Sequence, residues 1–401
     1  MRILVITDYL PYPLISGDRI RVYNLVRRVA GHHQVSLVAL LGTPDDEASL
    51  RHLGEFCEFV STAGHTWHSL KTELPGMLQY LFTGKPWELR LVHSKKLAET
   101  VRRLTSQTPY DIVDIQHSRM ALYREEIAPS CKAKTILTLH NIAYMQYEII
   151  AKIQSKPLRR LRDWLHSRAL WFWEPRYAAK FNHVITMSQL DTQRLLERNS
   201  RLSMTVIPNG VDTHKYQPLP LKENHAGLLF IGTMAYPPCA DGARYFCMQI
   251  LPLVEQRYPH VETWIVGAEP PPDVTALADE RIHVTGRVDD ILPYYRQTSI
   301  CVVPLRAGGG TRLKILEAMA LGRPVVTTSI GCEGLDAVHG KHLLIADDPA
   351  EFADHINRLI SDADLYRSIT QSARQFVESH YGWDTIAEKL MHLYETVRAK
   401  A

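Results

Sequence analysis

The sequence predicts an α/β protein built from two doubly wound domains, each with a parallel sheet. Short runs of β-branched and aliphatic residues alternate with segments whose apolar residues recur at helical spacing. A polar stretch with two prolines, residues 213–227, interrupts this alternation, which then begins again. Because parallel strands need a crossover between them, the alternation indicates parallel sheets. A chain of 401 residues is long enough for two such domains.

The first domain is expected at residues 1–212. A strand at 2–7, a helix at 17–33 with Gly31 near its end, and a strand at 34–41 form a βαβ unit. Further buried strands are expected at 111–116, 134–141, 183–188 and 204–212.

The second domain is expected at residues 213–382, where the same pattern repeats. Its strands are expected at 228–234, 261–268, 282–288, 300–305, 323–328 and 341–346. An amphipathic helix at 383–399 follows without a strand after it. Such a helix must bury its apolar face against another part of the protein, and the seam between the domains is a natural place.

Composition and charge exclude several classes of protein. Lys and Arg number 46 against 43 Asp and Glu, a balance that argues against a nucleic-acid-binding protein. The six cysteines show no zinc-ligand spacing and read as buried thiols in a reducing compartment. The first residues are too few and too polar for a signal peptide, and no run approaches the about 20 apolar residues of a membrane span. We therefore expect a cytoplasmic protein.

Three consecutive glycines, residues 308–310, separate a predicted strand from a predicted helix that carries Lys314 and Glu317. Ligands bind beyond the carboxyl ends of strands in open α/β sheets, and exposed N–H groups at a helix start favour a phosphate. Lys314 and Glu317 are three residues apart, so they share one side of the helix. The cation suits a diphosphate and the carboxylate suits ribose hydroxyls. The alternative is a tight turn followed by an exposed ion pair.

Several stretches resemble family 4 retaining glycosyltransferases. In the second half these are "PLRAGGGTRLKILEAMALGRPVVTT", "VIPNGVD" and "HVTGRVDDILPYYRQTSICVVPL"; in the first half they are "YLPYPLISGDRIRVYNL" and "TLHN". The resemblance spans nearly the entire chain. It implies a GT-B fold, two Rossmann-like domains facing each other across a cleft, with the final helix, 383–401, crossing back to the first domain. It also implies sugar transfer from a nucleotide-sugar with retention at the anomeric carbon and without a metal ion.

The resemblance also implies roles for individual residues. Glu317 would bind the nucleotide ribose, and Lys314, with Arg306 as a helper, would contact the donor diphosphate. In the first domain, His140 would lie near the transferred sugar and Asn141 beside the acceptor. The candidate catalytic residues are His140, Lys314 and Glu317, and the remaining donor-binding candidates are Gly17, Gly267, Arg287, Val288, Arg306, Gly309, Gly310 and Thr311.

Two departures from the family pattern affect these roles. Gly309 stands where the family has an acidic residue that contacts the sugar ring, so the identity and orientation of the sugar are open. The segment after the strand at 228–234 lacks the basic residues that usually follow it there. The phosphate charge must then be met by Lys314 and Arg306.

The segment 152–177 mixes basic residues with Trp164, Trp171, Phe172 and Trp173. One reading is a helix that contacts a membrane surface or a partner. The other is a long bridging helix whose aromatic residues pack on the first sheet while its charges are solvated, which is common in soluble proteins.

These observations lead to a hexosyltransferase-type enzyme, retaining and metal-independent, with a UDP- or GDP-linked sugar as donor substrate and no other cofactor. The acceptor would be a saccharide or a lipid-linked molecule, and the setting the assembly of a surface polysaccharide or glycolipid. We expect a cytoplasmic protein, with peripheral contact at the inner face of the membrane through 152–177 as one reading, and no nucleic-acid partner. Two alternatives stay open. One is a catalytically inactive GT-B protein that binds sugar or a partner, which Gly309 favours; the other is a nucleotide-sugar epimerase.

Overall fold

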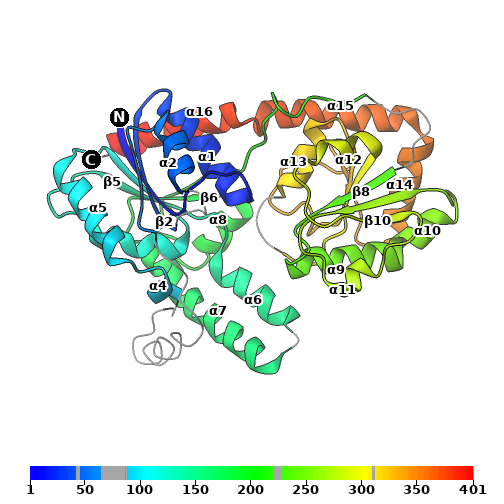
Figure 1. Cartoon of the computed structure of the whole chain (residues 1–401), viewed down its shortest axis with the longest axis horizontal. Coiled ribbons are helices and arrows are strands. Elements are labelled where there is room, and N and C mark those ends of the chain that lie inside the picture. Colours follow the sequence, from blue (N-terminus) through cyan, green and yellow to red (C-terminus); the bar gives the residue numbers. More distant parts are fainter. Residues whose placement is uncertain are drawn as a thin grey trace. The chain divides into compact units, whose positions relative to one another are not determined.

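The computed structural model divides the chain into two units (Figure 1). Unit 1 comprises Met1–Pro208 and Ile386–Ala401, and unit 2 comprises Asn209–Thr385. These boundaries lie within a few residues of those expected from the sequence. The structure describes residues 1–41, 46–64, 86, 88–154, 156–220, 227–308 and 312–400.

Unit 1 contains a seven-stranded sheet in the order β3-β2-β1-β4-β5-β6-β7, and every pairing is parallel. The strands are β1 (Arg2–Tyr9), β2 (Gln34–Leu41), β3 (Phe59–Thr62), β4 (Ile112–Gln116), β5 (Lys134–Thr138), β6 (His183–Thr186) and β7 (Met204–Val206). The sequence predicted all of these except β3, a short, half-buried edge strand without a strong apolar run.

The helices of unit 1 connect these strands. They are α1 (Gly17–Ala30), α2 (Asp46–Gly54), α4 (Glu88–Leu91), α5 (Lys95–Gln107), the 3-10 helix η2 (Ser118–Glu126), α6 (Ala143–Ile153), α7 (Pro157–Ala178) and α8 (Gln189–Leu196). Gly31 caps α1 as expected, but with φ −67° it ends the helix in a right-handed turn. The segment 152–177 is not one helix, because it covers the end of α6 and most of α7, which pack against each other.

Unit 2 contains a six-stranded sheet in the order β10-β9-β8-β11-β12-β13, again entirely parallel. The strands are β8 (Gly227–Ile231), β9 (Glu262–Val266), β10 (Ile282–Val284), β11 (Ile300–Val303), β12 (Val325–Thr327) and β13 (Leu344–Ile345). The helices are α9 (Pro237–Tyr245), the π-helix η3 (Phe246–Ile250), α10 (Leu251–Glu255), α11 (Pro272–Thr275), α12 (Leu292–Gln297), α13 (Leu313–Ala320), α14 (Pro349–Ser361) and α15 (Ala363–His380). The last helix, α16 (Trp383–Ala399), belongs to unit 1 from Ile386 onward.

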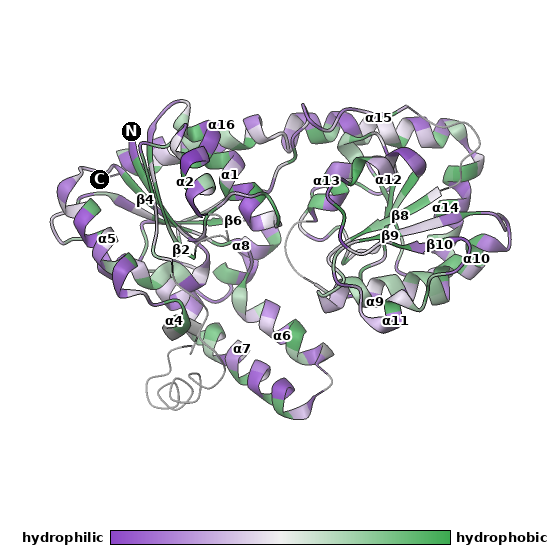
Figure 2. Ribbon diagram, in the orientation of Figure 1, coloured by the Kyte–Doolittle hydropathy of each residue, from purple (hydrophilic) through white to green (hydrophobic). Residues whose placement is uncertain are grey.

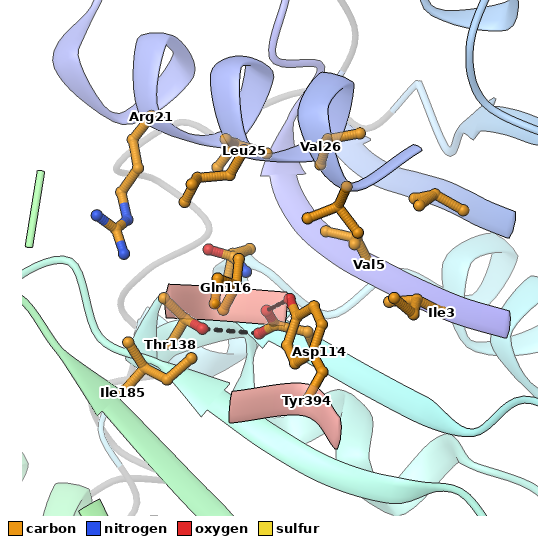
Figure 3. Close-up of a pocket in the computed structure, with 14 residues that line it drawn as sticks. Ile3, Val5, Arg21, Leu25, Val26, Asp114, Gln116, Thr138, Ile185 and Tyr394 are labelled. Carbon is orange, nitrogen blue, oxygen red and sulfur yellow. Dashed lines mark hydrogen bonds between the residues drawn. The ribbon is translucent and has the colours of Figure 1, made fainter. Parts of the chain in front are cut away.

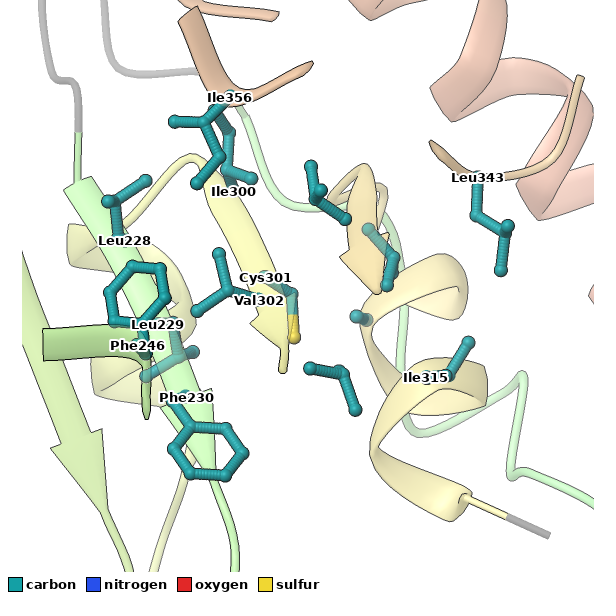
Figure 4. Close-up of a cluster of buried hydrophobic side chains, with 14 of the residues drawn as sticks. Leu228, Leu229, Phe230, Phe246, Ile300, Cys301, Val302, Ile315, Leu343 and Ile356 are labelled. Carbon is teal, nitrogen blue, oxygen red and sulfur yellow. The ribbon is translucent and has the colours of Figure 1, made fainter. Parts of the chain in front are cut away.

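Each unit has its own hydrophobic core around its sheet. In unit 2, Leu228 and Phe230 of β8, Val302 of β11 and Ile315 of α13 are fully buried in one cluster (Figure 4). The strands of both sheets are correspondingly apolar along most of their length (Figure 2). Burial on both faces explains why the strands read as continuous apolar runs rather than alternating ones.

The composition of residues 213–227 predicted a linker between the domains. In the structure, residues 213–220 are held on unit 2 by two arginines. The guanidinium of Arg323 donates to the carbonyls of Leu219 and Pro220 at 3.2 Å each, and that of Arg374 donates to Thr213 at 3.1 Å and to Tyr216 at 2.5 Å. The chain passes between the units at Pro208 and at Thr385 instead.

Candidate functional site

The carboxyl ends of β8, β9 and β10 lie next to one another in unit 2 because these strands are parallel neighbours. A glycine follows closely after each strand: Gly232, Gly267 and Gly286. The N–H of Gly232 donates to Val266 at 2.9 Å, and that of Gly267 donates to Gly286 at 3.1 Å. A Cβ at Gly267 would lie 1.7 Å from the carbonyl oxygen of Gly232, so only glycine fits there. The strand ends thus form a close-packed backbone edge of the kind that binds ligands.

Lys314, in the first turn of α13, reaches this edge. Its Nζ lies 3.8 Å from Sγ of Cys239 and 5.0 Å from the ring centroid of Phe230, and it abuts the position that a Cβ on Gly232 would occupy. Burial, together with the nearby charge of Arg312, lowers the pKa of this ammonium. A half-buried cation beside a thiol and an aromatic ring is costly unless an anion joins it, so the position favours an anionic ligand.

Glu317 lies one turn further along α13 and is half-buried. Burial raises the pKa of its carboxyl, while the charges of Lys215 and Lys314 act in the opposite direction. Within the described part of the chain, the carboxylate of Glu317 forms neither an ion pair with Lys314 nor a hydrogen bond. An exposed ion pair after a tight turn, the alternative considered from the sequence, does not describe these two residues.

Arg312 is a buried arginine that the sequence reasoning missed. It is the residue that immediately precedes α13, it is 8% exposed, and burial lowers the pKa of its guanidinium. Gly308 has φ +128°, and a Cβ there would lie 2.7 Å from a terminal nitrogen of Arg312. The first glycine of the triplet therefore leaves room for this guanidinium. Arg312 and Lys314 together place two cations at the start of α13.

Arg306 is placed differently from the expectation. Its guanidinium contacts both carboxylate oxygens of Asp241, at 2.7 and 3.1 Å, and lies over the ring of Tyr245, 4.5 Å from its centroid. Asp241 raises the pKa of Arg306 and already neutralises its charge. The role of Arg306 at a diphosphate stays a prediction, and Arg312 is a further cation near Lys314. No sequence motif singled Arg312 out, because its burial depends on the fold around Gly308.

Of the other residues predicted for unit 2, the structure describes Arg287 and Val288. Gly309, Gly310 and Thr311 lie outside the described residues, so the phosphate cradle stays a prediction. Arg287 is exposed after β10, and Val288 packs half-buried against the core of unit 2.

In unit 1, His140 follows β5 and is 7% exposed. Its Nε2 lies 2.9 Å from Oε1 of Gln116, and its ring stacks on His117 with centroids 3.9 Å apart. Burial, together with the charges of His117, Arg21 and Arg119, lowers the pKa of His140 well below its ordinary value, so the imidazole is neutral. A neutral imidazole can accept a hydrogen bond from a sugar hydroxyl.

His117 and Asp8 form a charged group beside His140 that the sequence reasoning also missed. Nε2 of His117 lies 3.3 Å from Oδ1 of Asp8, and Nε of Arg119 donates to Oδ2 of Asp8 at 2.8 Å. His117 has φ +70°, an uncommon conformation for a residue with a side chain. Asp8, His117 and Asp18 could each offer one atom to a cation. The guanidinium of Arg119, which already pairs with Asp8, works against such a site, and we assign none.

Gly17 and Asn141 complete the residues predicted for unit 1. Gly17 is exposed at the start of α1, on the loop that follows β1. Asn141 is half-buried directly after His140. Both therefore follow carboxyl ends of strands in the same sheet, as does His117 after β4.

Comparison with family models decides the relationship. The model of Glycosyltransferase Family 4 matches residues 15–215, half of the chain, and that of Glycosyl transferases group 1 matches residues 225–362. The chain belongs to glycosyltransferase family 4. This confirms the resemblance read from the motifs, the GT-B fold and the enzyme class.

Individual proteins agree with the family 4 relationship. A Klebsiella pneumoniae protein, "Uncharacterized 44.6 kDa protein in cps region", is 23% identical over 95% of this chain and 96% of its own length. The lipopolysaccharide 1,2-N-acetylglucosaminetransferase of Salmonella typhimurium is 22% identical over 75% of this chain and 76% of its own. The crystal structure of Anabaena Alr3699/HepE in complex with UDP superposes with a TM-score of 0.68 at 17% identity, covering 99% of this chain and 100% of that one.

In the part of this family 4 chain that the structure describes, none of the helices has the length and apolar character needed to cross a bilayer.

Proposed function

We propose that this glycosyltransferase moves a sugar from a nucleoside-diphosphate donor, linked to UDP or GDP, to a saccharide or lipid-linked acceptor. Transfer would proceed with retention at the anomeric carbon and without a metal ion, and it would serve the assembly of a surface polysaccharide or glycolipid. The observation that carries the proposal is the group Arg312, Lys314 and Glu317 at the carboxyl edge of the sheet in unit 2.

The chemistry of sugar transfer explains why these residue types suit the site. When the bond from the sugar to the diphosphate breaks, negative charge develops on the leaving phosphate. Buried cations held in place beforehand stabilise that charge more than water does. Lys314 and Arg312 supply them, and the carboxylate of Glu317 can accept hydrogen bonds from the ribose hydroxyls. A protein without a metal needs such cations, because no other charge opposes the diphosphate.

The relatives support the nature of donor and acceptor. The superposed Anabaena structure holds UDP, which favours UDP as the nucleotide here. One relative is named for the cps region and another for transfer of N-acetylglucosamine to lipopolysaccharide, which favours a surface polysaccharide or lipid-linked saccharide as acceptor. On the acceptor side we propose Gly17, His140 and Asn141.

An exposed apolar stripe on α7 supports contact with a membrane surface. Leu158, Leu161, Leu165 and Phe172 are 83%, 53%, 37% and 52% exposed, and their spacing places them on one side of the helix. The far side of the helix carries Leu170, which is buried in the core of unit 1. The helix is therefore apolar on two sides, one of which is exposed among the residues that the structure describes.

Charge complementarity selects an anionic lipid surface as the partner of this stripe. Of the acidic residues in α6 and α7, Asp163 and Glu174 are buried, and the partly exposed Glu148 pairs with Lys152 at 3.1 Å. The basic residues of 152–177 are Lys152, Lys156, Arg159, Arg160, Arg162, Arg168 and Arg176. A helix that combines exposed leucines and aromatics with arginines matches the composition of interfacial helices. Such contact would bring the enzyme to a lipid-linked acceptor.

Sedimentation with lipid vesicles tests the membrane contact. The protein should sediment with vesicles that contain phosphatidylglycerol and less with phosphatidylcholine alone, and salt should weaken the binding. Leu158→Ser with Leu161→Ser should reduce binding by about tenfold or more, since apolar area is lost from the lipid contact. Val338→Ser, which changes a 53% exposed residue of unit 2, is the matched control. Equal sedimentation of the double variant and the wild type would remove α7 from the proposal.

Nucleotide release from a panel of UDP- and GDP-sugars tests the activity itself. A transferase should release the nucleoside diphosphate faster when lipid-linked or free saccharide acceptors are added. An inactive binding protein would bind nucleotide without release, and an epimerase would change the sugar without releasing nucleotide. Either of these results would overturn the proposed reaction.

A further inference from the structure

A buried polar cluster lies in unit 1, apart from the residues that the proposed reaction uses directly (Figure 3). It lines one end of a pocket of about 390 Å³, its mouth included, between α1, the sheet and α16. The pocket is otherwise apolar, with Val5, Leu25 and Val26 among its walls. Its polar residues are Arg21, Asp114, Gln116, Thr138 and Tyr394.

Asp114 is the centre of this cluster. The hydroxyl of Tyr394, on α16, donates to its Oδ2 at 2.6 Å, and the hydroxyl of Thr138, on β5, donates to its Oδ1 at 2.7 Å (Figure 3). Gln116 stands two residues further along β4, on the same face of the sheet, and its side chain also favours the ionised carboxylate. Arg21 of α1 adds a favourable charge. The carboxylate thus takes hydrogen-bond donors from β5 and from α16.

Gln116 connects this cluster to His140. A glutamine amide has one oxygen and one NH2 group, so the amide oxygen can face only one neighbour at a time. Oε1 of Gln116 lies 2.9 Å from Nε2 of His140, which leaves its NH2 group for the carboxylate of Asp114. Because an oxygen acceptor requires a donor opposite, the proton of the neutral imidazole must sit on Nε2. The ring nitrogen Nδ1 then keeps its lone pair and forms no hydrogen bond in the described part of the chain.

We propose that Tyr394 and Asp114 are positioning residues for His140, acting through the Gln116 amide to fix its proton on Nε2 and keep Nδ1 as an acceptor. The last helix of the chain would thereby control the protonation of His140, which follows β5. The importance of this relay for catalysis rests on the proposed function, in which His140 faces the acceptor side. The relay itself is a property of the folded protein and needs no substrate.

The relay has a defined response to protonation. If Asp114 takes up a proton, its new O–H becomes a donor toward Gln116, and the amide turns so that its NH2 group faces His140. Nε2 of His140 must then accept, so its proton leaves to solvent and another is taken up at Nδ1. The groups that face Asp114 are Arg21 on α1, Gln116 on β4, Thr138 on β5 and Tyr394 on α16; His117, Arg21 and Arg119 face His140. Burial raises the pKa of Asp114 to about 6, which places the change in an accessible range.

Nitrogen NMR of the full-length protein, with 15N-labelled histidine, tests the relay. His140→Gln identifies the His140 signals by their loss. In the wild type, Nε2 should carry the proton at pH 8, and the shifts of Nε2 and Nδ1 should exchange as the pH falls through about 6. Tyr394→Phe should move this midpoint upward by about one pH unit or more, because the carboxylate loses a hydrogen bond to its charged form.

Two further variants make the result decisive. Thr138→Val removes the other hydroxyl donor and should also move the midpoint upward, which covers the case in which Tyr394→Phe does not fold. Tyr123→Phe is the matched control, because the hydroxyl of Tyr123 is equally buried in unit 1 but bonds to Val92 at 2.7 Å and Ser94 at 2.8 Å. It should leave the midpoint unchanged.

The outcomes separate the relay from the proposed reaction. A proton that stays on Nδ1 at all pH values, or one midpoint shared by all variants, would overturn the relay. If the midpoints move as expected while the wild type transfers no sugar, the proposed function fails and the relay stands. If transfer occurs, the turnover of each variant should change with pH at the same midpoint as its NMR titration. A turnover profile with a different midpoint would mean that the relay plays no part in catalysis.

Discussion

Glu317 and His140 are the residues on which the two halves of the proposed site depend. Each is sheltered from water: Glu317 on a helix of unit 2 and His140 after a strand of unit 1. Burial raises the pKa of the Glu317 carboxyl, so its charge is costly unless a ligand contacts it. Burial lowers the pKa of His140, which therefore remains neutral. Residues in such states are typical of binding and catalytic sites.

Replacing Glu317 with Ala should weaken nucleotide binding and leave the fold intact. Two ribose hydroxyls that bond to a charged group account for roughly 2–3 kcal/mol, or about 30- to 150-fold in affinity. Calorimetry with the nucleoside and the nucleoside diphosphate measures this, and both ligands should lose affinity to the same extent. Glu351→Ala, on the surface of α14, is a suitable control. Unchanged affinity in the folded variant would exclude a ribose contact.

His140→Ala should reduce turnover more than donor affinity, because His140 lies on the acceptor side of the proposal. His183→Ala offers a matched control. His183 is also a buried histidine of the same sheet, 4% exposed, but its ring bonds to Ser203 and Thr205. A large loss of stability with normal turnover in the remaining folded His140→Ala protein would mean that His140 is only a core residue.

Asp114 should make the stability of the protein depend on pH. Its pKa is raised from 3.8 to about 6 by burial, so the folded protein holds this proton between these pH values while the unfolded chain has released it. The stabilisation is complete below pH 3.8 and is lost as the pH rises through about 6. Asp114→Asn cannot titrate. Its unfolding free energy relative to wild type should therefore increase by about 3 kcal/mol between pH 4 and pH 7. Denaturant unfolding at both pH values measures this, and a constant difference would contradict the assignment.

At the scale of elements, local patterns predicted most strands, and long-range contacts explain what they missed. Continuous apolar runs identified the central strands of both sheets, because burial on both faces leaves that signature in the sequence. β3 lacks such a run, since an edge strand is only half-buried. The stretch 213–220 is polar and contains prolines, yet Arg323 and Arg374 from far along the chain hold its carbonyls. Pairs so distant in sequence leave no periodic signal.

The distinction between local patterns and long-range contacts also explains which residues of the candidate site could be predicted. Lys314 and Glu317 could be predicted because both belong to one helix with a distinctive motif. Arg312 could not, because its burial depends on Gly308 and the surrounding loops. Asp8 and His117 meet only because β1 and β4 are neighbours in the sheet. A polar residue at the end of each of two buried strands was the available signal for that pair.

Arg323→Met should destabilise unit 2 specifically. Arg323 is 2% exposed and donates to the carbonyls of Tyr295 and Thr298 at 3.0 and 2.9 Å as well as to the 213–220 segment. Leaving several buried carbonyls without donors should cost about 3–5 kcal/mol. Thermal unfolding and hydrogen exchange at 213–220 measure the effect. Arg244→Met, which breaks only a surface pair with Asp273, should cost less than about 1 kcal/mol. Similar losses for both variants would contradict the role given to Arg323.

At the scale of the whole molecule, the two units share an architecture but differ in the chemistry at their carboxyl edges. Unit 2 gathers Arg312, Lys314 and Glu317, which suit a diphosphate and a ribose. Unit 1 gathers a neutral His140 with Asp8 and His117, which suit sugar hydroxyls. Membership of glycosyltransferase family 4 agrees with this division of a donor and an acceptor between two units.

The central claim is that the start of α13 holds the diphosphate of a nucleotide-sugar, and calorimetry on Lys314→Met tests it most directly. This variant keeps most of the bulk of the side chain and removes its charge. It should lower the affinity for the nucleoside diphosphate by about 10- to 150-fold and leave the affinity for the nucleoside unchanged. Arg306→Met, whose charge Asp241 already neutralises, should lower it by less than about threefold. Equal affinity of folded Lys314→Met and wild type for the nucleoside diphosphate would contradict the account.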